Sequence, residues 1–298
     1  MLKYSEVARM RSSDYPPLRA SAASVSRTAQ WQYTSLVRID LVLIIVGAAF
    51  GVAASLVPTD AGIASAFASF TLLMVGFFVR LLPRLMRPER VWYDARAVTE
   101  SVKTASWNYM MRVDPYNQTD NASDTALLNT LGDLLSEHQD LSALIASVSG
   151  PQVTDYMRSL RSCGIAERAA LYRVERLSDQ LNWYQRSRTS HQTWAWIWFG
   201  IAQAAQLVAL LSAGYRIVNP TAPNVVGVFT SIAAAATAWT QMPRHDELAK
   251  SYGVAAHDLS IIGARFDNIP DDDTLARLVT QAENAISREH TSWVAKRS

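Results

Sequence analysis

The chain has 298 residues, of which 49% are hydrophobic and 18% are charged, and its formal net charge is +2. Typical globular domains contain about 25% charged residues, so this composition does not fit an ordinary soluble protein. The charge also does not describe a nucleic-acid binder. Much of the arginine lies beside apolar stretches, where the excess of positive residues on the cytosolic side of membrane proteins accounts for it.

The first forty residues form a polar arm rich in serine and arginine, superficially like an organellar transit peptide. Transit peptides are poor in acidic residues, and Glu6 and Asp14 argue against that interpretation. The first apolar run starts near Leu41 and is too long for the core of a secretory signal peptide. We therefore expect neither kind of targeting segment.

Four stretches of about 19 to 27 residues carry no acidic or basic side chain, and about 20 apolar helical residues span a bilayer. We predict spans at about 41–57, 61–79, 192–215 and 225–242. Short breaks at 58–60 and 219–223 separate the members of each pair. Connections that short predict two antiparallel hairpins, at about 41–79 and 192–242.

Basic residues gather at the open end of each predicted hairpin. They are Arg27, Arg38, Arg80, Arg84, Arg87 and Arg90 at the first, and Arg186, Arg188, Arg244 and Lys250 at the second. The closed ends carry only Asp60 and Arg216. The positive-inside rule then predicts a multi-pass protein of the inner (plasma) membrane, with both termini and the long central segment in the cytosol.

The cytosolic segments have helical periodicity, with predicted helices from Pro88 to Met111, near 123–147, and from about Ile165 into the third span as one rod. A further apolar stripe follows the fourth span, and a last helix begins near Asp271. The predicted fold class is an all-α membrane protein, with four transmembrane helices in two hairpins and long cytosolic helical extensions.

No motif of an enzyme is found in the sequence. The five histidines are scattered, and no zinc motif, nucleophile elbow or phosphate-binding loop occurs. We expect no catalytic residue, no cofactor and no metal site. Two weaker alternatives stay open: His191 and His245 as a pH sensor at the membrane boundary, and Cys163 as a reactive thiol instead of a buried small residue.

Polar side chains inside the spans are the candidate pore-lining residues: Gln203, Gln206, Thr230 and Thr237. Gln203 and Gln206 are three residues apart and thus share one face of a helix. An unpaired amide in hydrocarbon costs on the order of several kcal/mol. These side chains therefore either line a water-filled path or form hydrogen bonds between helices.

Three charged residues, Arg38, Asp40 and Arg80, are expected at one mouth of the first hairpin. A pair between Asp40 and Arg80 is plausible on this topology. In an oligomer such charges would either select ions or anchor the helices at the interface. Gly47 and Gly51 are spaced for close helix packing, which favours a tight bundle or oligomerisation.

The run WYDARAVTESVKTASWNY, residues 92–109, resembles the signature of the SLATT family, the SMODS- and SLOG-associating two-transmembrane effector domains. A second run, LYRVERLSDQLNWYQ at 171–185, is similar to the helix that precedes a hairpin in such units. The second unit departs from the pattern after its hairpin, at 251–253. The matching residues, taken to act in packing and ion pairing, are Trp92, Arg96, Glu100, Lys103 and Trp107.

The resemblance implies two tandem units, at 1–150 and 151–298, in a bacterial membrane effector of conflict and antiphage systems. It implies an effector that forms pores when a partner senses infection or makes a nucleotide signal. Our hypothesis is a homo-oligomeric, pore-forming or channel-like effector in the lipid bilayer, gated through its cytosolic helices. The alternative is a non-conducting scaffold that recruits cytosolic partners.

Overall fold

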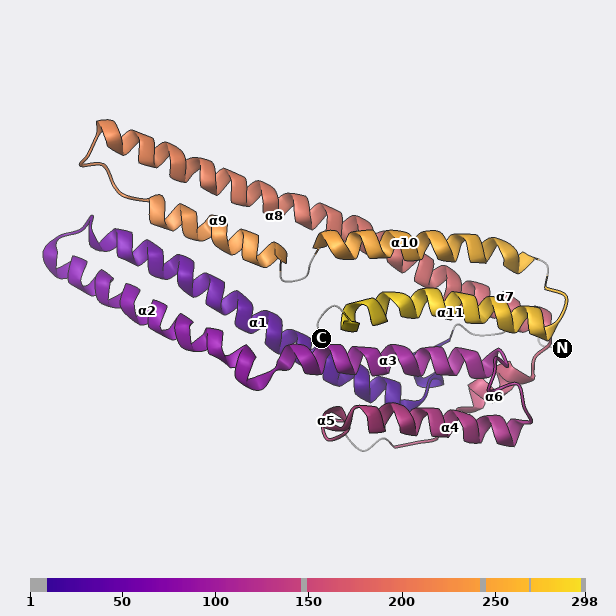
Figure 1. Cartoon of the computed structure of the whole chain (residues 1–298). Coiled ribbons are helices and arrows are strands. Elements are labelled where there is room, and N and C mark those ends of the chain that lie inside the picture. The colour runs from indigo at the N-terminus through magenta and orange to yellow at the C-terminus, as the bar shows by residue number, and fades with distance from the viewer. Residues whose placement is uncertain (1–9, 146–148, 242–244, 268, 296–298) are drawn as a thin grey trace. The chain divides into compact units, whose positions relative to one another are not determined.

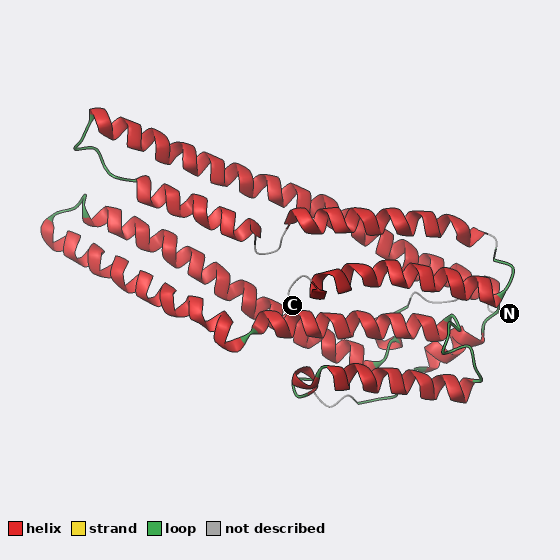
Figure 2. Cartoon of the chain, viewed as in Figure 1, coloured by secondary structure: helices red, strands yellow, loops and turns green. Residues whose placement is uncertain are grey.

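The computed structural model describes residues 10–145, 149–241, 245–267 and 269–295. Every regular element in these ranges is a helix, and they contain no strand (Figure 2). In chain order the elements are η1 (Ser12–Asp14), α1 (Pro17–Ala54), α2 (Thr59–Met86), α3 (Pro88–Met110), α4 (Asp120–Glu137), α5 (Gln139–Ser142), α6 (Asp155–Ser162), α7 (Ile165–Leu171), η2 (Tyr172–Ser178), α8 (Asp179–Val218), α9 (Val226–Gln241), α10 (His245–Gly263), η3 (Ala264–Asp267) and α11 (Asp272–Ala295) (Figure 1). The all-helical prediction is confirmed.

The chain forms two compact units. The first, which we call the bundle unit, contains residues 1–29, 90–188 and 250–298. The second, the apolar unit, contains residues 30–89 and 189–249. Each compact unit therefore combines separate stretches of the chain and is not one half of the sequence. The predicted sequence units at 1–150 and 151–298 stay a prediction.

The apolar unit contains three helices, or parts of helices, long and apolar enough to cross a membrane: α1, α2 and the stretch Ile165–Val218. The predicted fourth span falls on α9, which has 16 residues. At about 1.5 Å per residue α9 is roughly 24 Å long, shorter than a hydrocarbon core of about 30 Å.

Helices α1 and α2 pack against each other in opposite directions. A Cβ on Gly47 would lie 2.9 Å from Leu73, and a Cβ on Gly51 would lie 3.3 Å from Ser69 Oγ. The Ser69 hydroxyl donates to the carbonyl of Gly47 at 2.8 Å. The contacts move forward along one helix as they move back along the other, so the two helices run antiparallel. The two glycines let the backbones come close.

The bundle unit is built around large side chains of α3 and the chain that follows α6. The apolar stripe expected on α3 is buried, including Val98, Val102 and Tyr109, and Trp107 is fully buried among them. Trp107 meets Tyr172 edge-on at 5.5 Å, and Tyr172 stacks on Phe266 at 5.6 Å. One aromatic cluster thus joins α3, η2 and η3.

Two predicted helices differ in detail from the observed ones. The helix predicted at 123–147 is broken at His138, whose backbone angles (φ −122°, ψ 58°) are not helical, so that α4 ends at Glu137 and the short α5 follows. Residues 146–148 of that prediction lie outside the described residues. The rod predicted from Ile165 into the third span is continuous to Val218. Its second segment, η2, between α7 and α8, is a π-helix.

Candidate functional site

Gln203 and Gln206 lie on an exposed face of α8 in the isolated chain. Next to them in sequence runs a stripe of alanines that is buried: Ala195, Ala202, Ala205 and Ala209. The two amides are therefore turned away from the packed face of the helix. Within the part of the chain that the structure describes, no hydrogen bond joins either amide to another residue.

The hydroxyls of α9 have partners within their own helix. Thr230 donates to the carbonyl of Val226 at 2.9 Å, and Thr237 donates to that of Ala233 at 2.9 Å. A hydroxyl bonded in this way needs neither water nor a neighbouring helix. Thr230 and Thr237 thus differ from the two glutamines, although all four are candidate pore-lining residues.

The structure brings Asp40 and Arg80 together, with Arg80 Nε 3.3 Å from Asp40 Oδ2. The Asp40 side chain is 11% exposed and that of Arg80 is 67% exposed. A Cβ on Gly76 would lie 3.9 Å from Asp40 Oδ1, so this glycine leaves room for the carboxylate beside α2. The pair links α1 to α2 in addition to the small-residue contacts.

Arg38 makes a different contact from the other two charges of the predicted mouth. Its guanidinium lies over the ring of Trp239, 5.2 Å from the centroid. Trp239 also lies 6.2 Å from Trp198, centroid to centroid. A cation over an indole face is attracted by the ring quadrupole. Arg38 therefore connects α1 with α9, and Trp239 connects α9 with α8.

The family-motif residues lie on α3 in the bundle unit. Lys103 Nζ and Glu100 Oε1 are 2.7 Å apart, and both side chains are about one-fifth exposed. Burial lowers the pKa of Lys103, while the Glu100 carboxylate opposes that change. Trp92 stacks on Tyr93 at 4.7 Å. Arg96 is half-buried on the same helix.

Trp107, the last motif residue, has no exposed surface and is held at both ends. Its indole N–H donates to the hydroxyl of Tyr15 at 3.0 Å, and its ring packs on Tyr172. A buried indole N–H that has an acceptor avoids the cost of desolvation. The motif therefore fixes the arm before α1, α3 and the start of the long rod in one arrangement.

A buried ion pair in the same unit was not expected from the sequence. Arg176 donates to Glu283 at 2.9 Å from Nε and 2.8 Å from Nη2, and the side chains are 3% and 2% exposed. Burial by itself lowers the pKa of Arg176, but the facing carboxylate raises it, and the net direction is upward. Glu283 lies beside the buried residues Val279 and Ala282 of α11. A glutamate next to the apolar stripe of a helix is the sequence signal that could have indicated this ion pair.

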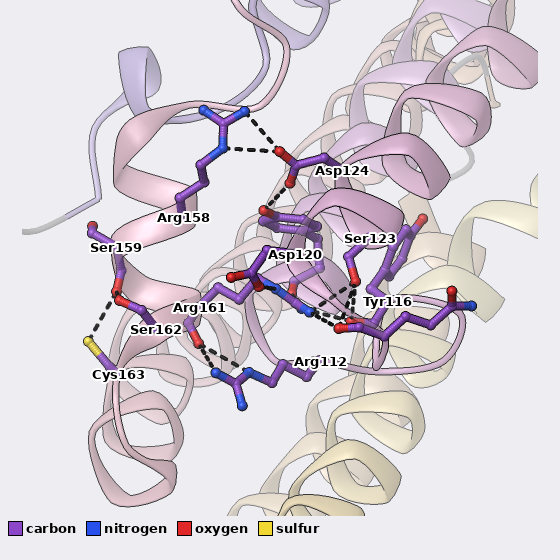
Figure 3. Close-up of polar contacts among 12 residues, drawn as sticks. Arg112, Tyr116, Asp120, Ser123, Asp124, Arg158, Ser159, Arg161, Ser162 and Cys163 are labelled. Carbon is purple, nitrogen blue, oxygen red and sulfur yellow. Dashed lines mark hydrogen bonds and ion pairs between the residues drawn. The ribbon is translucent and has the colours of Figure 1, made fainter.

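A second buried arginine, Arg161, organises the connection between α3 and α4 (Figure 3). Its Nη1 donates to the carbonyls of Tyr109 at 2.8 Å and Tyr116 at 2.7 Å, and its Nη2 to Ser123 Oγ at 2.9 Å. Its Nε contacts Asp120 at 3.1 Å. The planar guanidinium can bind several acceptors at once, so a single side chain supports a whole loop.

Nothing in the described geometry suggests chemistry at a metal or thiol. Among the described residues, no group of three or more histidine, cysteine or acidic side chains could hold a metal ion. Cys163 is half-buried, and its thiol donates to the carbonyl of Ser159 at 3.4 Å. Burial, and then the nearby Glu167, raise the pKa of Cys163, which disfavours the reactive thiolate. The side chain of His245 lies outside the described residues.

Comparison with protein families explains the tandem arrangement. The family model described as SMODS and SLOG-associating 2TM effector domain 3 matches residues 16–169, more than half of the chain. The chain belongs to the SLATT family. A second model, SMODS and SLOG-associating 2TM effector domain 1, matches residues 172–293, so that two SLATT domains cover the chain in tandem. No curated protein and no solved structure matches the chain.

The family match agrees with the presence of helices long and apolar enough to cross a membrane. SLATT domains are two-transmembrane effector domains associated with conflict systems, and the chain has three helices that could cross a membrane. It is accordingly a SLATT membrane protein. The run at 92–109 lies inside the first matched domain, and the second matched domain begins at Tyr172, the first residue of the π-helix.

Proposed function

We propose that this SLATT protein is a pore-forming or channel-like effector of a bacterial conflict or antiphage defence system, assembled from several copies. The observation that carries the proposal is the exposure of Gln203 and Gln206 on a helix of spanning length. An unpaired amide facing lipid tails costs several kcal/mol. In the membrane, the two amides would therefore face water along a path between copies.

The proposal includes four spans in two hairpins. Each matched domain is described as having two transmembrane segments, which supports counting α9 as the fourth. Its 16 residues are short for a bilayer, and a short span is accommodated by local thinning or by polar flanks that reach the interface. The antiparallel packing of α1 and α2 supports the first hairpin.

The proposed orientation follows from the arginine-rich open ends. With positive residues inside, both termini and the bundle unit would lie in the cytosol below an inner (plasma) membrane. The bundle unit would then hold the path closed until a sensor or a nucleotide-signalling partner acts on it. The proposal gives the chain no catalytic role and no cofactor.

A non-conducting scaffold that recruits cytosolic partners is the second candidate. One observation favours it: the hydroxyls of Thr230 and Thr237 are satisfied within α9. A dry bundle could hold those side chains without any path for water. Gln203 and Gln206 would then pair between copies, as interhelical hydrogen bonds do.

Ionic current across planar bilayers and dye release from liposomes test the proposal on the purified full chain. The wild type is compared with the double variant Gln203→Leu with Gln206→Leu, and with Gln241→Leu as a matched control at the exposed end of α9. We expect current in the wild type and the control once a candidate nucleotide signal opens the path, and a several-fold change in conductance in the double variant. Absence of current in all three, with candidate nucleotide signals added, would favour the scaffold.

A further inference from the structure

The rod from Ile165 to Val218 contains one irregular stretch, the seven-residue π-helix η2. Its sequence, YRVERLS, contains neither proline nor glycine, so no residue in it breaks an α-helix by itself. π-helices are rare and occur mostly as single-turn bulges within α-helices, frequently at functional sites. Contacts made by the segment therefore account for its conformation better than its local sequence does.

Two residues of the π-helix are attached to one carboxylate. Glu283 on α11 accepts hydrogen bonds from the Tyr172 hydroxyl at 3.0 Å and from both Arg176 donors described above. It also accepts one from Thr104 of α3 at 2.7 Å. The carboxylate of α11 thus accepts from two other elements, η2 and α3, and η2 supplies most of the donors.

The end of the π-helix and the first residues of α8 are held in place within the bundle unit by packing contacts. Leu177 is buried against Gly263, where a Cβ would lie 2.8 Å from Leu177 Cδ2. Trp183 and Tyr184 of α8 pack on Tyr252, with ring centroids 5.1 and 5.6 Å apart. Helix α8 then continues without a break to Val218. The register set at η2 therefore fixes the direction in which every later side chain of α8 points.

We propose that Glu283 is a latch that holds η2 in its π form, and that release of the latch converts η2 to α-helix and turns α8 about its axis. A π bulge holds one surplus residue, and one residue is about 100° of an α-helix at about 3.6 residues per turn. This regulation rests on the proposed function, because the turn would change the direction in which the face of α8 that carries Gln203 and Gln206 points.

Spin-label distances within the bundle unit test the latch without reference to conduction. Labels are placed on the full chain in liposomes at two exposed positions, Arg186→Cys on α8 and Gln281→Cys on α11, in a Cys163→Ser background. Turning α8 by about 100° moves a point at its side-chain radius of about 5–6 Å by roughly 8 Å. We expect Glu283→Gln to shift the distance distribution by that order.

Two further variants keep the test decisive. Tyr172→Phe removes only the hydroxyl that reaches Glu283 and should shift part of the population in the same direction. Deletion of Val174, which is 49% exposed, removes the surplus residue, and with it the response to Glu283→Gln. Asp124→Asn is the matched control, because Asp124 also joins helices of this unit, through Tyr109 and Arg158, but does not touch η2.

The outcomes separate the latch from the pore. Unchanged distances in Tyr172→Phe and in folded Glu283→Gln overturn the latch, as does an equal shift in Asp124→Asn. If Glu283→Gln loses its helical content, the Tyr172→Phe result decides alone. A distance shift accompanied by no current in any variant supports the latch and counts against the proposed pore.

Discussion

Arg158 and Arg161 lie one turn apart on α6 but in different environments. The Arg158 side chain is 49% exposed and pairs with Asp124 at 2.9 Å. The Arg161 side chain is 3% exposed and donates to backbone carbonyls as well as to Asp120. Exposed ion pairs contribute little because water and salt screen them. A buried arginine that satisfies several acceptors leaves them all unsatisfied when it is removed.

This contrast predicts different costs for the same substitution. Arg161→Lys should lower the free energy of unfolding by about 2–4 kcal/mol, because an ammonium cannot replace a planar five-donor fork and leaves carbonyls unpaired. Arg158→Lys should cost less than about 1 kcal/mol. Thermal and denaturant unfolding of the two variants in the same detergent measures the difference. Equal costs would show that the Arg161 contacts do not support the α3–α4 connection.

At the scale of elements, small residues determine how α1 and α2 pack and turn. Gly62, in the first turn of α2, is buried, and a Cβ there would lie 2.9 Å from the carbonyl oxygen of Ala54. Backbone cannot move aside as easily as a flexible side chain can. Gly200 on α8, by contrast, has nothing within 4 Å of the position of its Cβ. The close turn therefore depends on one glycine and not on glycine in general.

Gly62→Ala should destabilise the protein by about 1–3 kcal/mol, the usual cost of overpacking. Gly200→Ala, which adds the same methyl group in open space, should be neutral or slightly stabilising because alanine favours helix over glycine. Melting temperatures in one detergent compare the two variants. Comparable losses at both positions would contradict the close approach of Gly62 to Ala54.

The antiparallel arrangement of α1 and α2 can be tested by cross-linking. With Cys163→Ser, the pair Gly51→Cys and Ser69→Cys should form an intramolecular disulfide under mild oxidation, because a Cβ at position 51 would lie 3.3 Å from the side-chain oxygen of Ser69. A disulfide needs its two Cβ atoms about 3.5–4.5 Å apart. The control pair replaces Ser69→Cys by Phe70→Cys, on a side chain that is 63% exposed. Efficient cross-linking only in the control would contradict the packing.

For the whole molecule, periodicity predicted the elements well because apolar stripes and spans are local properties of the sequence. The α3 stripe, the onset of α11 near Asp271 and the continuous rod could all be read in this way. Family resemblance predicted the tandem SLATT domains, which the two family matches confirm. The four-span count could not be settled by composition, because α9 is helical over only 16 residues.

The polar interior of the bundle unit could not be predicted in the same way. The partners Arg176 and Glu283 are more than one hundred residues apart, and periodicity carries no information on such pairing. The pair between Asp40 and Arg80 could be predicted from the sequence, because a tight turn fixes the register between α1 and α2. The break at His138 and the π-helix depend on tertiary packing, which overrides local helix propensity.

The central claim is that Gln203 and Gln206 face a water-filled path, and thiol accessibility tests it most directly. Single cysteines at 201, 203, 206 and 208 are introduced with Cys163→Ser, and liposomes are treated with a membrane-impermeant thiol reagent. The account predicts labelling of Gln203→Cys and Gln206→Cys, but not of Ile201→Cys or Val208→Cys, whose side chains are exposed and apolar and lie on the opposite side of the helix, where they would face lipid. Protection of positions 203 and 206, or uniform labelling of all four, would contradict it.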